Sequence, residues 1–148
     1  MIKFEKSIFI NRPQQDVFDF YSNLENETQW RNLKSVKQTS EGPIGAGSTW
    51  RETGEFLGRE FELDIEMISY DPPRQYIAKT ISGPFPVEVS NSLEAHDGGT
   101  LITVSARAEI GGFFKLAEGL VKKQLESQMH SEYETLKQIL EAVPEKTV

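Results

Sequence analysis

The 148-residue sequence predicts an α+β fold in which a curved antiparallel sheet of about seven strands wraps a long C-terminal helix. Three observations support this. Alternating apolar and polar residues run from Leu33 to Ile110, one long amphipathic stretch closes the chain, and two short helical stretches follow the first strand. The chain shows no linker and no internal repeat, so we expect a single domain over residues 1–148.

The chain begins with a strand, because "IKFEKSIFI" places its apolar residues on one face at a period of two. Pro13 then marks the start of a helix, since proline suits the first helical position. Val17, Phe18 and Tyr21 have helical spacing, and a break near Ser22 leads to a second short helix that ends around Trp30.

The middle of the chain predicts strands joined by tight turns. "REFELDIEM" alternates apolar and acidic residues, and "PVEVSNSLE" and "TLITVSARAEI" repeat the period. The turns are "FLGRE", "YDPPRQ", "SGPFP" and "HDGGT", and connections this short require antiparallel pairing. The phase of the strand over 74–82 is open. We place Tyr76, Ala78 and Thr80 inward, in preference to Ile77, Lys79 and Ile81.

The last element is predicted as one helix from Gly112 to Val143, about 30 residues long, with Pro144 beyond its end. Its apolar stripe would lie on the sheet. One helix cannot fill the concave face of a strongly curved sheet, so we expect a cavity between helix and sheet.

Composition excludes several classes of site and partner. The chain has no cysteine, so thiol catalysis and thiolate metal sites are excluded, and its two histidines, His96 and His130, are far apart in sequence. The net charge of −7 argues against nucleic-acid binding. We find no signal peptide and no apolar run near the roughly 18 residues of a membrane span, so we expect a cytoplasmic protein without metal or cofactor.

The glycine-rich stretch "SEGPIGAGSTW" resembles a phosphate-binding loop only superficially. Such a loop needs a lysine and a following helix, whereas here a strand-forming sequence without lysine follows. We therefore interpret it as a connection between strands.

Strand phase and helix spacing indicate which side chains line the predicted cavity. The candidates are Trp30, Trp50, Glu52, Phe61, Leu63, Tyr76, Asn91, Ala117, Val121, Gln124, Leu125 and Gln128. Each has an alternative: Glu52 at a solvent-facing bulge, Asn91 satisfying a backbone group, the tryptophans as plain core, and the glutamines on the helix surface. Glu52 is the sole carboxylate that we place inside, and burial beside Trp50 would raise its pKa, so it is a candidate proton donor.

The start of the last helix, "FFKLAEGLV", is apolar all round. Phe113, Leu116 and Leu120 face away from the main stripe and need another cover: the cavity mouth, the partner of a homodimer, or a membrane surface.

Several stretches in order along the chain carry a resemblance to a known family. They are "SIFINRPQQDVFDFYSNLENETQW", "IGAGSTWRE", "SYDPPRQY", "GGTLITVSARAE" and "ETLKQILE". On these the chain resembles the polyketide cyclase/dehydrase-like branch of the START/Bet v 1 (SRPBCC) superfamily, the helix-grip fold. The resemblance implies a deep, mostly apolar pocket, with "FLGRE" and "SGPFP" as two of its gating loops. Members include lipid carriers, hormone receptors, cyclases and hydrolase-like enzymes, so it does not fix the function.

Three functions follow as hypotheses. The first is binding of a hydrophobic small molecule, such as a lipid, polyketide or aromatic metabolite. The second is a cyclase/dehydratase-type enzyme in which Glu52 or Tyr76 moves a proton, and an inward carboxylate with a perturbed pKa would favour it. The third is an accessory or interaction protein that binds no ligand. A cavity packed shut, with Phe113, Leu116 and Leu120 exposed or in a dimer interface, would favour it.

Overall fold

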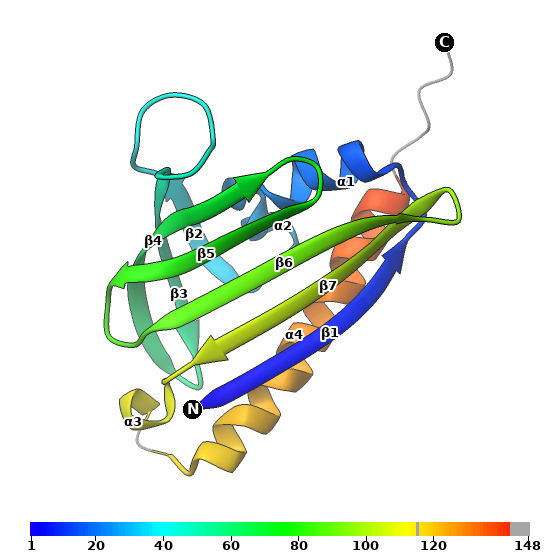
Figure 1. Ribbon diagram of the computed structural model, residues 1–148. Coiled ribbons are helices and arrows are strands. Elements are labelled where there is room, and N and C mark those ends of the chain that lie inside the picture. Colours follow the sequence, from blue (N-terminus) through cyan, green and yellow to red (C-terminus); the bar gives the residue numbers. More distant parts are fainter. Residues whose placement is uncertain (115, 143–148) are drawn as a thin grey trace.

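Seven strands form one antiparallel sheet that curls around the C-terminal helix in the computed structural model of the protein (Figure 1). The structure describes residues 1–114 and 116–142. The strands are β1 (Ile2–Ile10), β2 (Leu33–Gln38), β3 (Thr49–Phe56), β4 (Arg59–Asp71), β5 (Gln75–Ser82), β6 (Val87–His96) and β7 (Gly99–Ala108). Their order in the sheet is β1-β7-β6-β5-β4-β3-β2. The predicted helix-grip arrangement is confirmed.

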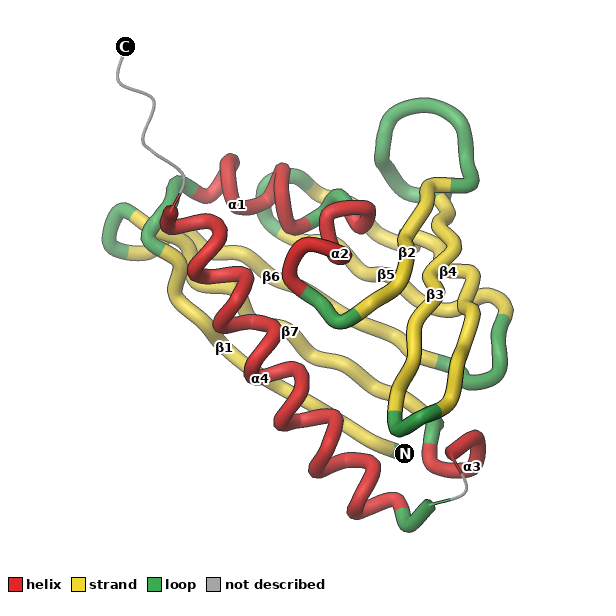
Figure 2. Tube along the Cα trace, turned by 180° about the vertical axis from the view of Figure 1, so that it is seen from behind, coloured by secondary structure: helices red, strands yellow, loops and turns green. Residues whose placement is uncertain are grey.

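The helices lie on the concave side of this sheet (Figure 2). They are α1 (Gln14–Tyr21), the short 3₁₀ helix η1 (Leu24–Asn26), α2 (Glu27–Trp30), α3 (Gly111–Phe114) and α4 (Glu118–Ala142). Helix α4 crosses the sheet, with α1 and α2 near its C-terminal end and α3 near its start. None of the helices in residues 1–114 and 116–142 is long and apolar enough to span a membrane.

The prediction of one helix from Gly112 to Val143 was wrong at its start. The structure has two helices, α3 and α4, and Val143 lies outside the described residues. The reason is packing: Phe114 turns back against Phe56, with ring centroids 5.0 Å apart, whereas α4 must run across the sheet. A single straight helix cannot do both. At the start of α4 the Ala117 carbonyl accepts from the Leu120 and Val121 amides.

Irregular pairing accompanies the curl of the sheet. The register shifts between Leu33 and Ser35 in β2, and at two points in β4, where it pairs with β5. Such bulges bend a strand and increase its local twist. The extra residues lie in β2, β4 and β5, on the side of the sheet away from β1 and α4 in Figure 2. The curl leaves room between the strands and α4.

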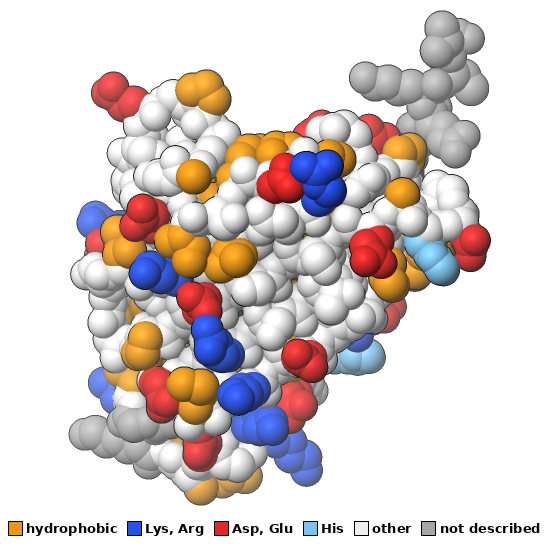
Figure 3. Space-filling view, viewed as in Figure 1, with side chains coloured by type: hydrophobic (Ala, Val, Ile, Leu, Met, Phe, Trp, Pro, Cys, Tyr) orange, Lys and Arg blue, Asp and Glu red, His pale blue; other side chains and the backbone are white. Residues whose placement is uncertain are grey.

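The core divides into two apolar clusters. The larger lies beneath α1, α2 and the C-terminal half of α4 and contains Phe18, Trp50 and Leu136, each fully buried. The smaller lies near α3 and contains Phe56, Phe85 and Val121. The outer face of the sheet carries interspersed acidic and basic side chains (Figure 3), with ion pairs such as Arg51–Asp64 at 3.0 Å.

The glycine-rich stretch is the connection between β2 and β3, as predicted. Gly42 and Gly47 have φ of 88° and 94°, which side chains with a Cβ rarely adopt. The Gly47 amide donates to the Met67 carbonyl, and the Gly45 amide donates to the Ser48 hydroxyl. These two backbone amides therefore donate to groups of the protein itself and hold the connection in place.

Candidate functional site

A cavity of about 150 Å³ lies between the concave face of the sheet and α4. Most of its lining is apolar and comes from Leu63, Ile65, Ala78, Val89, Ala106, Leu125 and Met129. Four phenylalanines line it near α3: Phe56, Phe61, Phe85 and Phe114. Polar side chains come from α1, α2 and the two residues after it, β3, β5, β6 and α4. An apolar cavity with a few convergent polar groups is the usual make-up of a small-molecule site.

Strand phase places the inward side chains. On β3, Glu52 and Gly54 are buried while Arg51 and Glu55 are exposed, which follows the period-two pattern. On β5, Tyr76, Ala78 and Thr80 line the cavity, which is the phase that we predicted, and Ile81 of the other phase is half exposed. Lys79, also of the other phase, reaches the cavity lining from an exposed position.

Eight of the twelve predicted site residues line the cavity. They are Trp30, Glu52, Phe61, Leu63, Tyr76, Asn91, Leu125 and Gln128. The solvent-facing alternative for Glu52 is excluded, because only 4% of the residue is exposed. Whether these residues contact a ligand stays a prediction.

The other four predicted residues lie elsewhere. Trp50 shares the phase of Glu52 but lies two residues before it in β3, where it is fully buried in the larger apolar cluster. Val121 is fully buried in the smaller cluster. Ala117 precedes α4, and both it and Gln124 are exposed. The one-helix prediction explains the error at Ala117, which lies before α4. Gln124 lies on the solvent side of α4, and Val121 points inwards but packs in the smaller cluster and not on the cavity.

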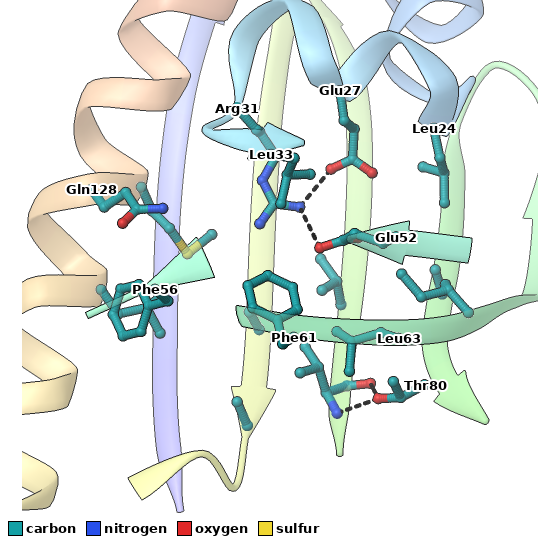
Figure 4. A pocket seen from close by; sticks show the side chains of 18 of the residues that line it. Leu24, Glu27, Arg31, Leu33, Glu52, Phe56, Phe61, Leu63, Thr80 and Gln128 are labelled. Atoms are coloured by element: carbon teal, nitrogen blue, oxygen red, sulfur yellow. Dashed lines mark hydrogen bonds and ion pairs between the residues drawn. The ribbon is translucent and has the colours of Figure 1, made fainter. Parts of the chain in front are cut away.

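Arg31 lies at the centre of a group of charged side chains that the sequence analysis missed. It follows α2 directly, and its guanidinium approaches Glu27 at 2.6 Å, Glu132 of α4 at 3.4 Å and Glu52 of β3 at 4.0 Å. Figure 4 shows the contacts to Glu27 and Glu52 above the ring of Phe61. The four-residue spacing of Glu27 and Arg31 was the one available signal in the sequence.

Glu132 is held from three directions. It accepts hydrogen bonds from the backbone amide of Asn32 at 2.9 Å and from Gln128 at 3.1 Å, besides its contact with Arg31. These bonds tie α4 to the segment after α2, so Gln128 supports the charged group as well as lining the cavity.

Glu52 differs from the other two glutamates because its carboxyl group has no hydrogen bond among the described residues, only the 4.0 Å approach of Arg31. Burial raises its pKa from the ordinary value of 4.5 to about 7. Arg31 opposes this rise, while Glu27 and Glu132 add to it. A carboxyl group with a pKa near neutrality can give or take a proton at physiological pH.

Three tyrosines and an asparagine form a hydrogen-bonded group next to the cavity. The Tyr21 hydroxyl donates to the Asn91 side-chain oxygen at 2.5 Å, so Tyr133, also at 2.5 Å, donates to Tyr21. Tyr76 donates to the Tyr21 backbone carbonyl at 3.2 Å. Burial raises the pKa of all three tyrosines, so their phenols remain protonated. The Asn91 side-chain nitrogen has no partner among the described residues.

The apolar residues at the start of the last helical region take two different positions. Phe113 packs against Phe85, with ring centroids 5.3 Å apart, and the guanidinium of Arg59 lies 4.1 Å from its ring centroid. Of the three covers considered for Phe113, the structure therefore points to the cavity side, since Phe85 lines the cavity. Leu116 and Leu120 are 46% and 63% exposed.

No three His, Asp or Glu side chains are arranged to hold a metal ion in the part of the chain that the structure describes. The three glutamates around Arg31 lie close together because each approaches its guanidinium.

Comparisons with known proteins place the chain in context. Residues 1–141 match the family model described as polyketide cyclase/dehydrase and lipid transport. A search of curated proteins found no match. Many solved structures share the fold.

Three of these structures show the range. A START superfamily protein from Mycobacterium smegmatis has a TM-score of 0.78 at 16% identity, over 95% of this chain and 98% of that one. The protein TTHA0849 from Thermus thermophilus has a TM-score of 0.77 at 17% identity, over 93% and 96%. The di-domain aromatase/cyclase BexL, from the BE-7585A biosynthetic pathway, has 0.72 at 16%, over 96% of this chain and 50% of that one. At these identities the likeness concerns the fold.

Proposed function

Because the chain belongs to the polyketide cyclase/dehydrase and lipid transport family, we propose that it binds an apolar small molecule in the cavity between the sheet and α4. The observation that carries the proposal is the lining. Apolar side chains from β3–β7 and α4 surround the space, and a smaller number of polar side chains reach it.

The size of the cavity suggests what it holds. About 150 Å³ is the volume of a dry protein cavity that accepts benzene, so the space as it stands fits a single ring with a short side chain. A longer lipid would have to separate α3 from the turns around Leu57 and Pro84, the two loops that we predict to gate the cavity. Small aromatic molecules are therefore the right first probes.

Propylbenzene tests the proposal without involving any polar group. We expect saturation-transfer NMR to detect its binding to the wild-type protein and to an Ala95→Phe control, since Ala95 is exposed on β6. Ala106 lines the cavity, and Ala106→Phe would place a ring in the same space and abolish the signal. Circular dichroism would check that both variants are folded. Equal signals from all three proteins, or none from the wild type, would refute the proposal.

A second function, catalysis of proton transfer in a cyclase/dehydratase-type reaction, is favoured by one observation: the buried Glu52 carboxyl faces the cavity with a pKa of about 7. Tyr76, the other candidate, is less suitable because burial raises its pKa and its hydroxyl already donates to Tyr21. Glu52 would take a proton from carbon next to a carbonyl, or return it.

Hydrogen–deuterium exchange at the enolisable carbon of indanone tests this second function. We expect the wild-type protein to accelerate the exchange in D₂O, with a midpoint near neutrality, and Glu52→Gln to remove the acceleration while propylbenzene still binds. Equal rates in the two proteins would exclude Glu52 as the base.

The third hypothesis, an interaction protein without a ligand, required a cavity packed shut, and we do not propose it. A cytoplasmic location, a homodimer and the absence of nucleic-acid binding stay predictions from the sequence.

A further inference from the structure

The polar end of the cavity contains more carboxyl groups than cations. Among the described cavity-lining residues around Arg31, two glutamates, Glu27 and Glu52, lie within 4.0 Å of its guanidinium, and Glu132 reaches it from α4 at 3.4 Å. With all three ionised, one positive and three negative charges leave a net charge of −2, and protonation of Glu52 leaves −1. In either state the local charge is negative.

Arg31 is committed to the two glutamates that approach it most closely. Its Nη1 donates to Glu27 at 2.6 Å, and its Nε donates to Glu132 at 3.4 Å. The Glu132 carboxylate also accepts hydrogen bonds from the Asn32 amide and the Gln128 side chain. Glu52 is left as the acid with unused hydrogen-bonding capacity, although its side chain is only 6% exposed.

The Glu52 oxygens are not among the fully enclosed atoms without a partner, so they open on the cavity that Glu52 lines. A polar group inside a protein without a hydrogen bond costs free energy. The lone pairs of the Glu52 carboxyl accept a hydrogen bond whether the group is protonated or not. A ligand that brings a hydroxyl or ammonium group would supply the missing donor. A ligand that brings a carboxylate would place a further negative charge beside three acids. The repulsion between these charges would exclude carboxylate ligands.

The other charged residues that line the cavity, Glu55 of β3 and Lys79 of β5, are exposed and opposite in sign, so they do not change this balance. The tyrosines Tyr21, Tyr76 and Tyr133, from α1, β5 and α4, are uncharged and donate their hydroxyl hydrogens within the protein.

Asn91 of β6 is also uncharged. Trp30 of α2 is uncharged too. The side-chain nitrogens of Asn91 and Trp30 have no partner among the described residues, so each can donate to a ligand hydroxyl, which accepts as well as donates.

We propose that the cavity selects ligands whose polar group donates hydrogen bonds and bears no negative charge, and that the Glu52 carboxyl receives that donor. The inference rests on the proposed function, since it specifies the ligand class of the same cavity. A cavity with this selectivity would bind alcohols, phenols and amines in preference to fatty acids and other carboxylates.

Three probes with one apolar body test the proposal: para-propylbenzyl alcohol, para-propylbenzylamine and para-propylbenzoate. Their dissociation constants would be measured by calorimetry at about pH 8, where a group with a pKa of about 7 is mostly ionised. We expect the alcohol and the amine to bind at least about tenfold more tightly than the benzoate. Benzoate binding as tight as that of the alcohol or the amine would refute the inference.

Glu52→Gln identifies the residue responsible, since glutamine keeps the shape and one acceptor but has no charge. We expect amine binding to weaken and benzoate binding to strengthen, so that their ratio narrows by about tenfold or more, while alcohol binding changes little. Glu62→Gln, on the exposed side of β4, is the matched control and should leave all three constants unchanged.

The outcomes separate this inference from the proposed function. If propylbenzene and all three probes fail to bind, both are wrong. If the probes bind without preference, or if Glu52→Gln leaves the ratio unchanged, the proposed function stands and the selectivity is refuted. The comparison of the three probes on the wild-type protein needs no variant and holds even if Glu52→Gln does not fold.

Discussion

The burial of Glu52 makes the stability of the protein depend on pH in a direction that can be measured. The group has a pKa of 4.5 when exposed and about 7 in the folded protein. Below both values it is protonated in the folded and unfolded states alike. As the pH rises from one value to the other, the unfolded state releases its proton while the folded state keeps it. The free energy of unfolding therefore falls over this window and levels off above it.

Linkage gives the size of this fall. Each unit of pKa difference corresponds to about 1.4 kcal/mol. Part of the effect of Glu52 falls below pH 5, so between about pH 5 and about pH 8 it lowers the free energy of unfolding by roughly 2 to 3 kcal/mol. Glu52→Gln cannot ionise and lacks this contribution. Arg31 keeps its contacts with Glu27 and Glu132 in the variant, so the rest of the charged group remains.

Urea unfolding of both proteins at a series of pH values measures the effect. Other groups titrate in both proteins, and the difference between the two curves isolates Glu52. We expect the variant to gain roughly 2 to 3 kcal/mol relative to the wild type from about pH 5 to about pH 8. Glu62→Gln, at an exposed position, should follow the wild type. Parallel curves for wild type and Glu52→Gln would show that Glu52 is not held in a desolvated site.

Three further predictions concern the surroundings of the cavity, each measured as a loss of stability in urea. Arg31→Gln leaves three glutamates without their shared cation and should lower the free energy of unfolding by roughly 2 to 3 kcal/mol. This is less than for a fully buried pair, because a quarter of the Arg31 side chain is exposed. An unchanged free energy of unfolding would contradict the prediction. Tyr133→Phe removes the donor to Tyr21 and should cost about 1 kcal/mol, more than Tyr70→Phe. Leu136→Ala, at a fully buried site, should cost about 2 to 5 kcal/mol, and a loss well below this would show that α4 is not anchored there.

The strands and their inward faces could be predicted because burial on one side of a sheet imposes a period of two on the sequence. The alternation around Leu63 is such a signal, and it placed Phe61 and Leu63 on the cavity. The same reasoning placed Glu52 and Asn91 inside, although they are polar, because each shares the phase of apolar neighbours. Phase does not locate a residue along the strand, so it could not separate Trp50 in the core from Glu52 at the cavity.

The charged group around Arg31 could not be predicted, since its members come from α2, β3 and α4 and meet only through the tertiary fold. Glu132 lies about a hundred positions from Arg31 in sequence, and nothing in its neighbourhood marks it as buried. The separation of α3 from α4 was missed for a related reason. The apolar run around Phe114 has helical spacing, and its contacts with Phe56 on β3 and with Phe85 hold it away from the path of α4.

The central claim, a ligand in the cavity beneath α4, is tested most directly by NMR of methyl-labelled protein titrated with para-propylbenzyl alcohol. The account predicts saturable shifts of the methyl groups of Leu63 and Leu125, which line the cavity, and little change at Leu140, which is buried outside it. Shifts confined to the exposed methyl groups of Leu116 and Leu120, or no saturable shift at any site, would contradict the claim.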